Sequence, residues 1–120
     1  MSVSSPQFLT FAQADLSLRE ERQSLIASNI ANANTPGYKS KDIDFEKDLD
    51  AALRNHDTKP VGGIDYKTGF PVGLDGNDVS MTAEKLESLS NSGAMRSEVT
   101  YLHQSTTDLI TALRPNPNGI

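Results

Sequence analysis

The chain is organised around the stretch SNIANANTPGY, residues 28–38. The residue before a proline is pushed out of the α region, so a helix that arrives from the N-terminal side must end at Thr35. Gly37 adopts a positive φ at little cost, Tyr38 is an amphipathic anchor, and asparagine amides bond nearby backbone groups in turns. The stretch predicts a specified helix exit, for which an ordinary helix C-terminus is the simpler alternative. The residues that carry this exit, called the turn motif below, are Asn29, Asn32, Asn34, Thr35, Pro36, Gly37 and Tyr38.

Upstream of this exit, the pattern predicts an N-terminal helix over residues 6–33, on the order of 40 Å long. Ser5 and Pro6 suit a helix start, because the hydroxyl caps a free N–H and proline needs none at the first helical position. Apolar residues recur three and four apart in two adjacent stripes, and together they make a face wider than one partner helix covers. They include Phe11, Leu16, Leu18, Leu25, Ile26 and Ile30. The charged run at 19–22 interrupts this face, and we expect it to be a solvated surface.

The middle of the chain, residues 34–78, is predicted to hold the turn, a short helix and a loop. Asp44 is placed to cap a helix that begins at Phe45 and ends near Asn55. The stretch 57–78 is rich in glycine and proline and is typical of a loop. Its apolar residues alternate only roughly, which is a weak signal of a β-hairpin.

A second long helix is predicted over residues 79–114, followed by a polar tail at 115–120. Its apolar residues form two tracks, a short one at Leu86 and Leu89 and a heptad track after Gly93. The heptad track consists of Met95, Val99, Leu102, Thr106, Leu109 and Leu113. Glycine costs a helix about 1 kcal/mol relative to alanine, so Gly93 indicates either a kink or the close approach of another helix.

These elements predict a mainly α fold, with residues 1–120 as a single domain. We expect the two terminal helices to form an antiparallel, coiled-coil-like pair, joined by the short helix and the Gly/Pro-rich loop. Such a pair buries one stripe of each helix and leaves apolar surface of the N-terminal helix exposed, which indicates a partner. The apolar residues of both helices are therefore the candidate assembly faces. An intramolecular bundle that covers every stripe is the alternative.

The composition excludes several classes of function. A net charge of −5 argues against nucleic acid, and the absence of cysteine removes disulfides and thiolate metal sites. No stretch has the ~18 consecutive apolar residues of a membrane helix, and the first residues lack a secretory signal, which taken alone predicts a cytoplasmic protein. His56 and His103 have no carboxylate at ligand spacing, and residues 75–78 lack the later ligands of a calcium loop. We therefore predict no enzyme, metal, cofactor or small-molecule substrate.

Two parts of the chain resemble a known family. The turn motif, followed by KSKDIDF at residues 39–45, closely resembles the N-terminal signature of the flagellar rod and hook proteins. Residues 74–81 and 91–92 are similar to the segments that open the last helix of its basal-body rod members. The family usually has a bulky residue and a basic–tyrosine pair after Asn-Ser, whereas this chain has Gly93 there and a short tail with two prolines.

The resemblance implies a structural subunit of the proximal rod of the bacterial flagellar basal body, which polymerises through its terminal helices. It also implies export through the flagellum's own type III apparatus without a cleaved signal, and assembly in the periplasm. The implied partners are the chain itself and other rod subunits, with membrane-ring, adaptor and export-gate proteins at the rod base. A small soluble helical adaptor or export chaperone is the alternative function.

Overall fold

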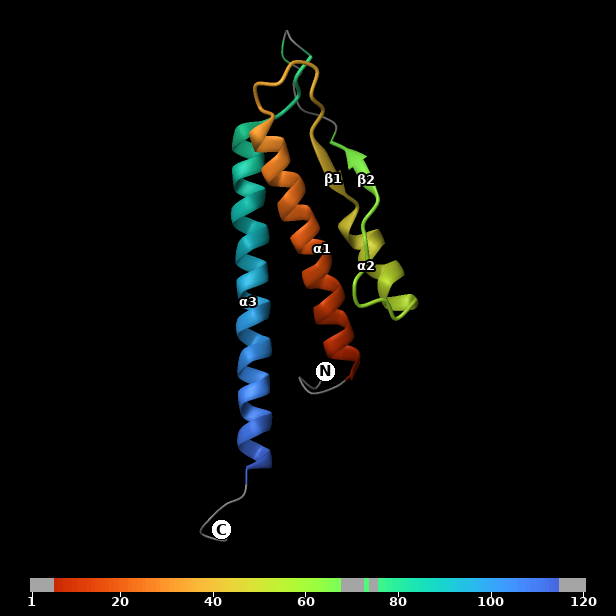
Figure 1. Cartoon of the computed structure of the whole chain (residues 1–120), viewed down its shortest axis with the longest axis vertical. Helices are drawn as coiled ribbons and strands as arrows, with labels where there is room; N and C mark the ends of the chain where they lie inside the picture. The colour runs from red at the N-terminus through yellow and green to blue at the C-terminus, as the bar shows by residue number, and fades with distance from the viewer. Residues whose placement is uncertain (1–5, 68–72, 74–75, 115–120) are drawn as a thin grey trace.

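The computed structural model describes residues 6–67, 73 and 76–114, and it is mainly helical (Figure 1). Its elements in chain order are α1 (Pro6–Ala31), β1 (Lys41–Ile43), α2 (Phe45–Arg54), β2 (Ile64–Tyr66) and α3 (Met81–Leu113). Figure 1 shows an elongated molecule in which α1 and α3 run antiparallel, while α2 and the two strands lie on the other side of α1. The predicted mainly α fold with two long terminal helices is confirmed.

Local capping explains where the helices begin. The carboxylate of Asp44 accepts a hydrogen bond from the backbone N–H of Lys47 at 3.3 Å, which starts α2 as predicted. The hydroxyl of Ser80 accepts from the N–H of Ala83 at 3.4 Å, which starts α3. The predicted cap at Ser5 and the polar tail lie outside the described residues.

The two strands form a small antiparallel sheet that joins distant parts of the chain. Lys41 pairs with Tyr66 and Ile43 pairs with Ile64. A hairpin was weakly indicated within residues 57–78, and one strand does form there. Its partner, however, is the segment directly after the turn motif, with α2 between the two strands. That pairing has no local sequence signal, because a long-range partner is chosen by the position of α1 and α2.

The core lies on both sides of α1, which is the central element of the fold. The fully buried apolar residues are Ala12, Ala14, Leu18, Ile26, Ile43 and Ala52. Because α3 covers one side of α1 while α2 and β1 cover the other, the two stripes of α1 need two partners, and the chain supplies both. The prediction that apolar surface of the N-terminal helix stays exposed is therefore wrong. Among the described residues of α1, Leu9 is the only large apolar side chain that is exposed.

The charged run at 19–22 is not the solvated surface that the sequence suggested. The guanidinium carbons of Arg19 and Arg22 lie 4.7 and 5.4 Å from the ring centroid of Phe45. Arg22 also forms an ion pair with Asp42 at 2.9 Å. The two arginines thus fasten α2 and β1 onto α1 through cation–π and charge contacts, and this use of the run has no periodic signal in the sequence.

Candidate functional site

The turn motif is the centre of a polar network at one end of the molecule. The side chain of Asn29 is fully buried. Its Oδ1 accepts from the backbone N–H of Lys41 at 2.9 Å and from the hydroxyl of Tyr38 at 3.1 Å. Its Nδ2 donates to the carbonyl of Lys41 at 2.8 Å and to Oε1 of Glu84 at 3.1 Å. The amide therefore uses its full bonding capacity to hold β1 and α3 against α1.

A second asparagine closes the turn from the α3 side. Nδ2 of Asn77 donates to the carbonyls of Asn32 and Thr35 at 2.9 and 2.7 Å. These carbonyls lie beyond the end of α1, where a helix leaves its last C=O groups without internal partners. Oδ1 of Asn77 accepts from the N–H of Val79 at 2.9 Å, so the same side chain also orders the approach to α3.

The chain after the turn is tied to the same segment. Oδ1 of Asp78 accepts from the backbone N–H of Ser40, and the N–H of Asp78 donates to the carbonyl of Tyr38 at 3.2 Å. Gly37 has a φ of +74°, and a Cβ built on Gly76 would lie 3.4 Å from the Cα of Gly37. The two segments therefore cross with glycine against glycine. We name the six residues that make these contacts the turn cluster: Asn29, Asn32, Thr35, Tyr38, Asn77 and Asp78.

A buried ion network lies beneath the turn cluster. Nζ of Lys67 lies 2.8 Å from Oε1 of Glu84 and 2.7 Å from Oε2 of Glu87. Only 7% of the Lys67 side chain and 1% of the Glu84 side chain are exposed. Burial lowers the pKa of Lys67, but the hydrogen bonds and charges of the two carboxylates outweigh it and raise that pKa above its ordinary value. The network holds the segment after β2 onto the first turns of α3.

The contact between α1 and α3, called the seam below, is polar along most of its length. Nε2 of Gln23 donates to the hydroxyl of Ser88 at 2.8 Å. Nδ2 of Asn91, a buried side chain, donates to the carbonyl of Arg19 at 2.8 Å and to Oε1 of Gln23 at 3.0 Å. Asn91 and Glu84 are seven residues apart, so they lie on one face of α3, and that face points at α1.

The apolar residues of α3 are largely left outside. Leu86 and Leu89 are 63% and 68% exposed, on the side of the helix away from Glu84 and Asn91. Further along α3, Val99, Leu109 and Leu113 are 53%, 48% and 75% exposed. At about 100° per residue, Leu109 and Leu113 lie on a different side of α3 from Leu86 and Leu89. Exposed apolar area is unfavourable in water, since each Å² costs about 25 cal/mol relative to burial. Among the described residues, these side chains of α3 are therefore candidate contacts for a partner, together with the exposed Val61, Ile64 and Tyr66 at and before β2.

The structure divides the predicted site residues into three groups. Leu18 and Ile26 belong to the core of the chain itself. The second group is half-buried and comprises Phe11, Leu16, Leu25, Ile30, Met95 and Leu102. The third group is exposed and comprises Leu86, Leu89, Val99, Leu109 and Leu113. Within the turn motif, Asn34 and Pro36 are exposed, whereas Asn29 and Tyr38 hold the network.

Sequence reasoning missed the partners of the turn motif. Lys67 and Asn77 fall in the predicted loop and Glu84 falls in the second predicted helix, with no link to Asn29. The sequence does contain one signal of such a partner. Gln23 stands within an apolar stripe, and a polar residue there indicates a polar partner across the seam.

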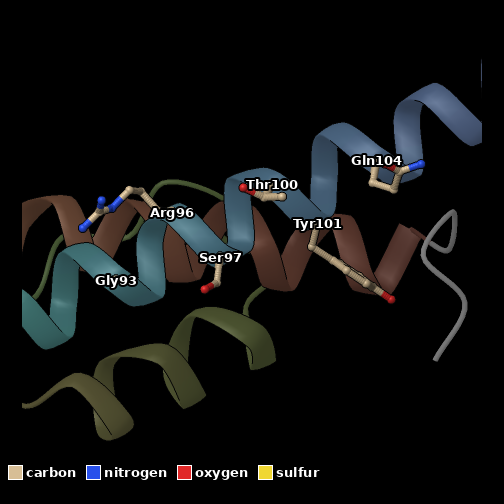
Figure 2. Close-up of a pocket in the computed structure, with 6 residues that line it drawn as sticks. All are labelled: Gly93, Arg96, Ser97, Thr100, Tyr101 and Gln104. Carbon is tan, nitrogen blue, oxygen red and sulfur yellow. The ribbon is translucent and has the colours of Figure 1, made fainter.

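Nothing in the described residues forms a catalytic or metal centre. A groove of about 670 Å³ follows α3 and is lined by Gly93, Arg96, Ser97, Thr100, Tyr101 and Gln104 (Figure 2). These residues include no carboxylate or imidazole that serves as a general base. Within the described ranges, no group of three metal-ligating side chains occurs. Likewise, no helix in those ranges combines the length and the apolar character that a membrane span needs.

A match to a family model shows the class of protein to which the chain is similar. Residues 9–39, which hold most of α1 and the whole turn motif, match the family model described as flagella basal body rod protein. The turn motif therefore lies within the signature of a structural rod family, whereas its partners Lys41, Asn77 and Glu84 lie outside the matched residues.

Similarity over most of the chain then gives the particular family. The flagellar basal body rod protein FlgB of Proteus mirabilis is 30% identical, over 87% of this chain and 91% of the relative. The FlgB of Cereibacter sphaeroides is 35% identical over 86% and 90%, and that of Escherichia coli is 35% identical over 70% and 76%. The chain belongs to the FlgB family of flagellar basal body rod proteins. It is accordingly a structural subunit of the rod and no enzyme, and the adaptor or chaperone alternative is not favoured.

Proposed function

We propose that this rod subunit assembles through the exposed apolar residues of α3, while the turn cluster fixes the corner at which the chain leaves α1. Its neighbours are further copies of itself and other rod subunits, with membrane-ring, adaptor and export-gate proteins at the proximal end of the rod. The subunit reaches the periplasm through the type III apparatus of the flagellum. The FlgB relatives support the assembly as a class, and the α3 surface is our assignment of where it occurs.

The observation that carries this proposal is the orientation of α3. Its buried residues include two polar ones, Glu84 and Asn91, whereas Leu86 and Leu89 are exposed. A helix that only completed a private bundle would direct its leucines inward. An α3 that directs them outward gains stability only when a neighbouring subunit covers them. Contacts of this heterologous kind, which do not close on themselves, generate a helical array.

The turn cluster has a different role in the proposal. Its hydrogen bonds run within the chain, from Asn29 to Lys41 and from Asn77 to Asn32 and Thr35. They therefore determine the shape that a subunit presents rather than the surface that a neighbour touches.

The proposal is tested by changing exposed leucines to serine. The double variant Leu86→Ser with Leu89→Ser should keep the helicity of the isolated chain, because neither side chain is buried. We expect it to abolish swimming in a strain that carries it as the only copy. The matched control is Val61→Ser, a residue that is 86% exposed but lies outside α3.

Two outcomes would contradict the proposal. Normal swimming in the leucine double variant would show that this face is not an assembly surface, and equal loss in Val61→Ser would show no specificity for α3. Circular dichroism with light scattering at micromolar concentration adds an independent reading. A chain that gains helix only on association fits a rod subunit. A chain that is a fully helical dimer at every concentration would favour the chaperone alternative.

A further inference from the structure

Two carboxyl groups face the same cavity in the half of the seam that is remote from the turn cluster. Asp15 of α1 is only 4% exposed. On α3, Oε1 of Glu98 is buried, and no donor among the described residues bonds to it. Both residues line a cavity of about 490 Å³ together with the aromatic rings of Phe8, Phe11 and Tyr101. Asp15 and the buried Oε1 atom of the half-buried Glu98 thus lie beside apolar rings, where an uncompensated charge is unfavourable.

One cation is available to this pair. Nε of Arg19 lies 2.9 Å from Oδ2 of Asp15, and its guanidinium is also held by Asn91 and by the ring of Phe45. Among the described residues that line the cavity, the other titratable group is the phenol of Tyr101, and none of those residues comes from α2 or the sheet. Two carboxylates and a single arginine leave one negative charge without a partner, so a proton held between the acids relieves the repulsion.

The titration of Glu98 agrees with this geometry. Burial raises the pKa of Glu98, and the hydrogen bond with Asp15 and its charge raise it further, to about 8, against a smaller opposing effect of Arg19. Glu98 is therefore protonated at neutral pH and can donate to Asp15.

We propose that Asp15 and Glu98 form a proton-dependent latch, which holds the first half of α1 on α3 while they share a proton and releases it when the proton is lost. In the same half of the seam the rings of Phe8 and Tyr101 pack edge to face, with 5.4 Å between their centroids. Loss of the proton places a second negative charge beside Asp15, which weakens this half of the seam and favours pairing of the two helices elsewhere. That last consequence rests on the proposed function, whereas the latch itself is a property of the isolated chain.

The latch is tested by distances between spin labels, because the chain has no native cysteine. One label pair, Gln7→Cys with Gln104→Cys, spans the latched half at exposed positions. A second pair, Ala27→Cys with Lys85→Cys, spans the half beneath the turn cluster. We expect the first distance to lengthen and broaden between about pH 6 and pH 9, while the second stays constant.

Two variants separate the latch from a general effect of charge. Glu98→Gln keeps a hydrogen-bond donor without a titratable group, so the first label pair should stay short at every pH. Glu20→Gln removes an exposed charge from α1 and should open like the wild type. The proposal is overturned if the wild-type distance does not change, or if Glu98→Gln opens as the wild type does. A carboxyl carbon of Glu98 that titrates near its ordinary value of 4.5 by NMR would overturn it as well.

Discussion

The two ends of α3 differ in almost every physical respect. At the turn end, Glu84 is 1% exposed and is bonded to Asn29 and Lys67. At the far end, Leu109 and Leu113 are 48% and 75% exposed, and α1 no longer runs beside them (Figure 1). One end is polar and closed by the chain itself, whereas the other is apolar and open.

This difference shows how one helix serves two tasks. Buried polar groups are costly when they lose their partners, so the turn end tolerates few geometries. Exposed leucines do not constrain the geometry of the chain itself. Burying them against a neighbouring subunit is energetically favourable. The buried polar side of α3 therefore specifies the shape of the chain, and we propose that its exposed apolar residues serve association. The variants below test that division, from the largest expected effect to the smallest.

The largest effect is expected for Asn29→Ala. The change removes four hydrogen bonds and leaves the backbone of Lys41 and one oxygen of Glu84 short of partners, at a cost of at least ~3 kcal/mol in the free energy of unfolding. Urea denaturation followed by circular dichroism measures it. The control is Asn34→Ala, an exposed residue of the same motif, which should change that free energy by less than about 0.5 kcal/mol. Equal losses would show that the network does not specify the turn.

The next effect concerns the glycine of the turn. Gly37→Val places a β-branched residue at a φ of +74°, and we expect a loss of about 1–3 kcal/mol together with impaired swimming. Pro36→Ala, which leaves this φ untouched, should loosen the turn and impair swimming less. Gly63→Val is the matched control, because Gly63 has open space and no positive φ. Normal swimming in the Gly37 and Pro36 variants would remove the turn from the assembly mechanism.

The pH dependence of stability separates the two halves of the seam. Between about pH 5 and pH 8 the folded chain keeps the proton of Glu98, whose pKa is raised from 4.5 to about 8, while the unfolded chain releases it. The free energy of unfolding should therefore fall as the pH rises through this range. The pairing of Lys67, whose pKa is raised above 10.5, stabilises the fold throughout and is lost only at still higher pH. A free energy of unfolding that stays flat between pH 5 and pH 8 would contradict the assignment of Glu98.

The smallest effect is expected for the glycine within α3. A Cβ at Gly93 meets nothing within 4 Å, and α3 continues unbroken through this residue. Gly93→Ala should accordingly stabilise the isolated chain by up to about 1 kcal/mol. If a neighbouring helix packs closely against Gly93, a strain that carries Gly93→Ala will swim poorly, although the isolated variant chain is more stable. Unchanged stability would instead indicate that the isolated helix is frayed there.

The helix boundaries could be predicted from the sequence, whereas the strand pairing could not. Helix boundaries followed from Pro36, Asp44 and the apolar periodicity, because proline, caps and periodicity act over a few residues. The pairing of Lys41–Ile43 with Ile64–Tyr66 did not follow, since long-range pairing depends on which elements α1 brings together.

The candidate site divides in the same way. The turn motif was readable as a turn, but its bonds to Asn77 and Glu84 span 42 or more residues and leave no periodic trace. The two apolar tracks of α3 were also readable, including their change of register near Gly93. What the pattern could not give was the direction in which each track points, because that depends on the polar seam that α1 presents.

The hydrogen bonds of the turn cluster also affect how the sequence of this protein can evolve. The amides of Asn29 and Asn77 bond mainly to main-chain atoms, such as the N–H and carbonyl of Lys41. Every residue type offers that carbonyl, and every type except proline offers that N–H. Position 41 is therefore free to drift, while the two amides have no substitute of equal length and equal donors. We expect lineages of this protein to diverge around the corner and to keep both asparagines.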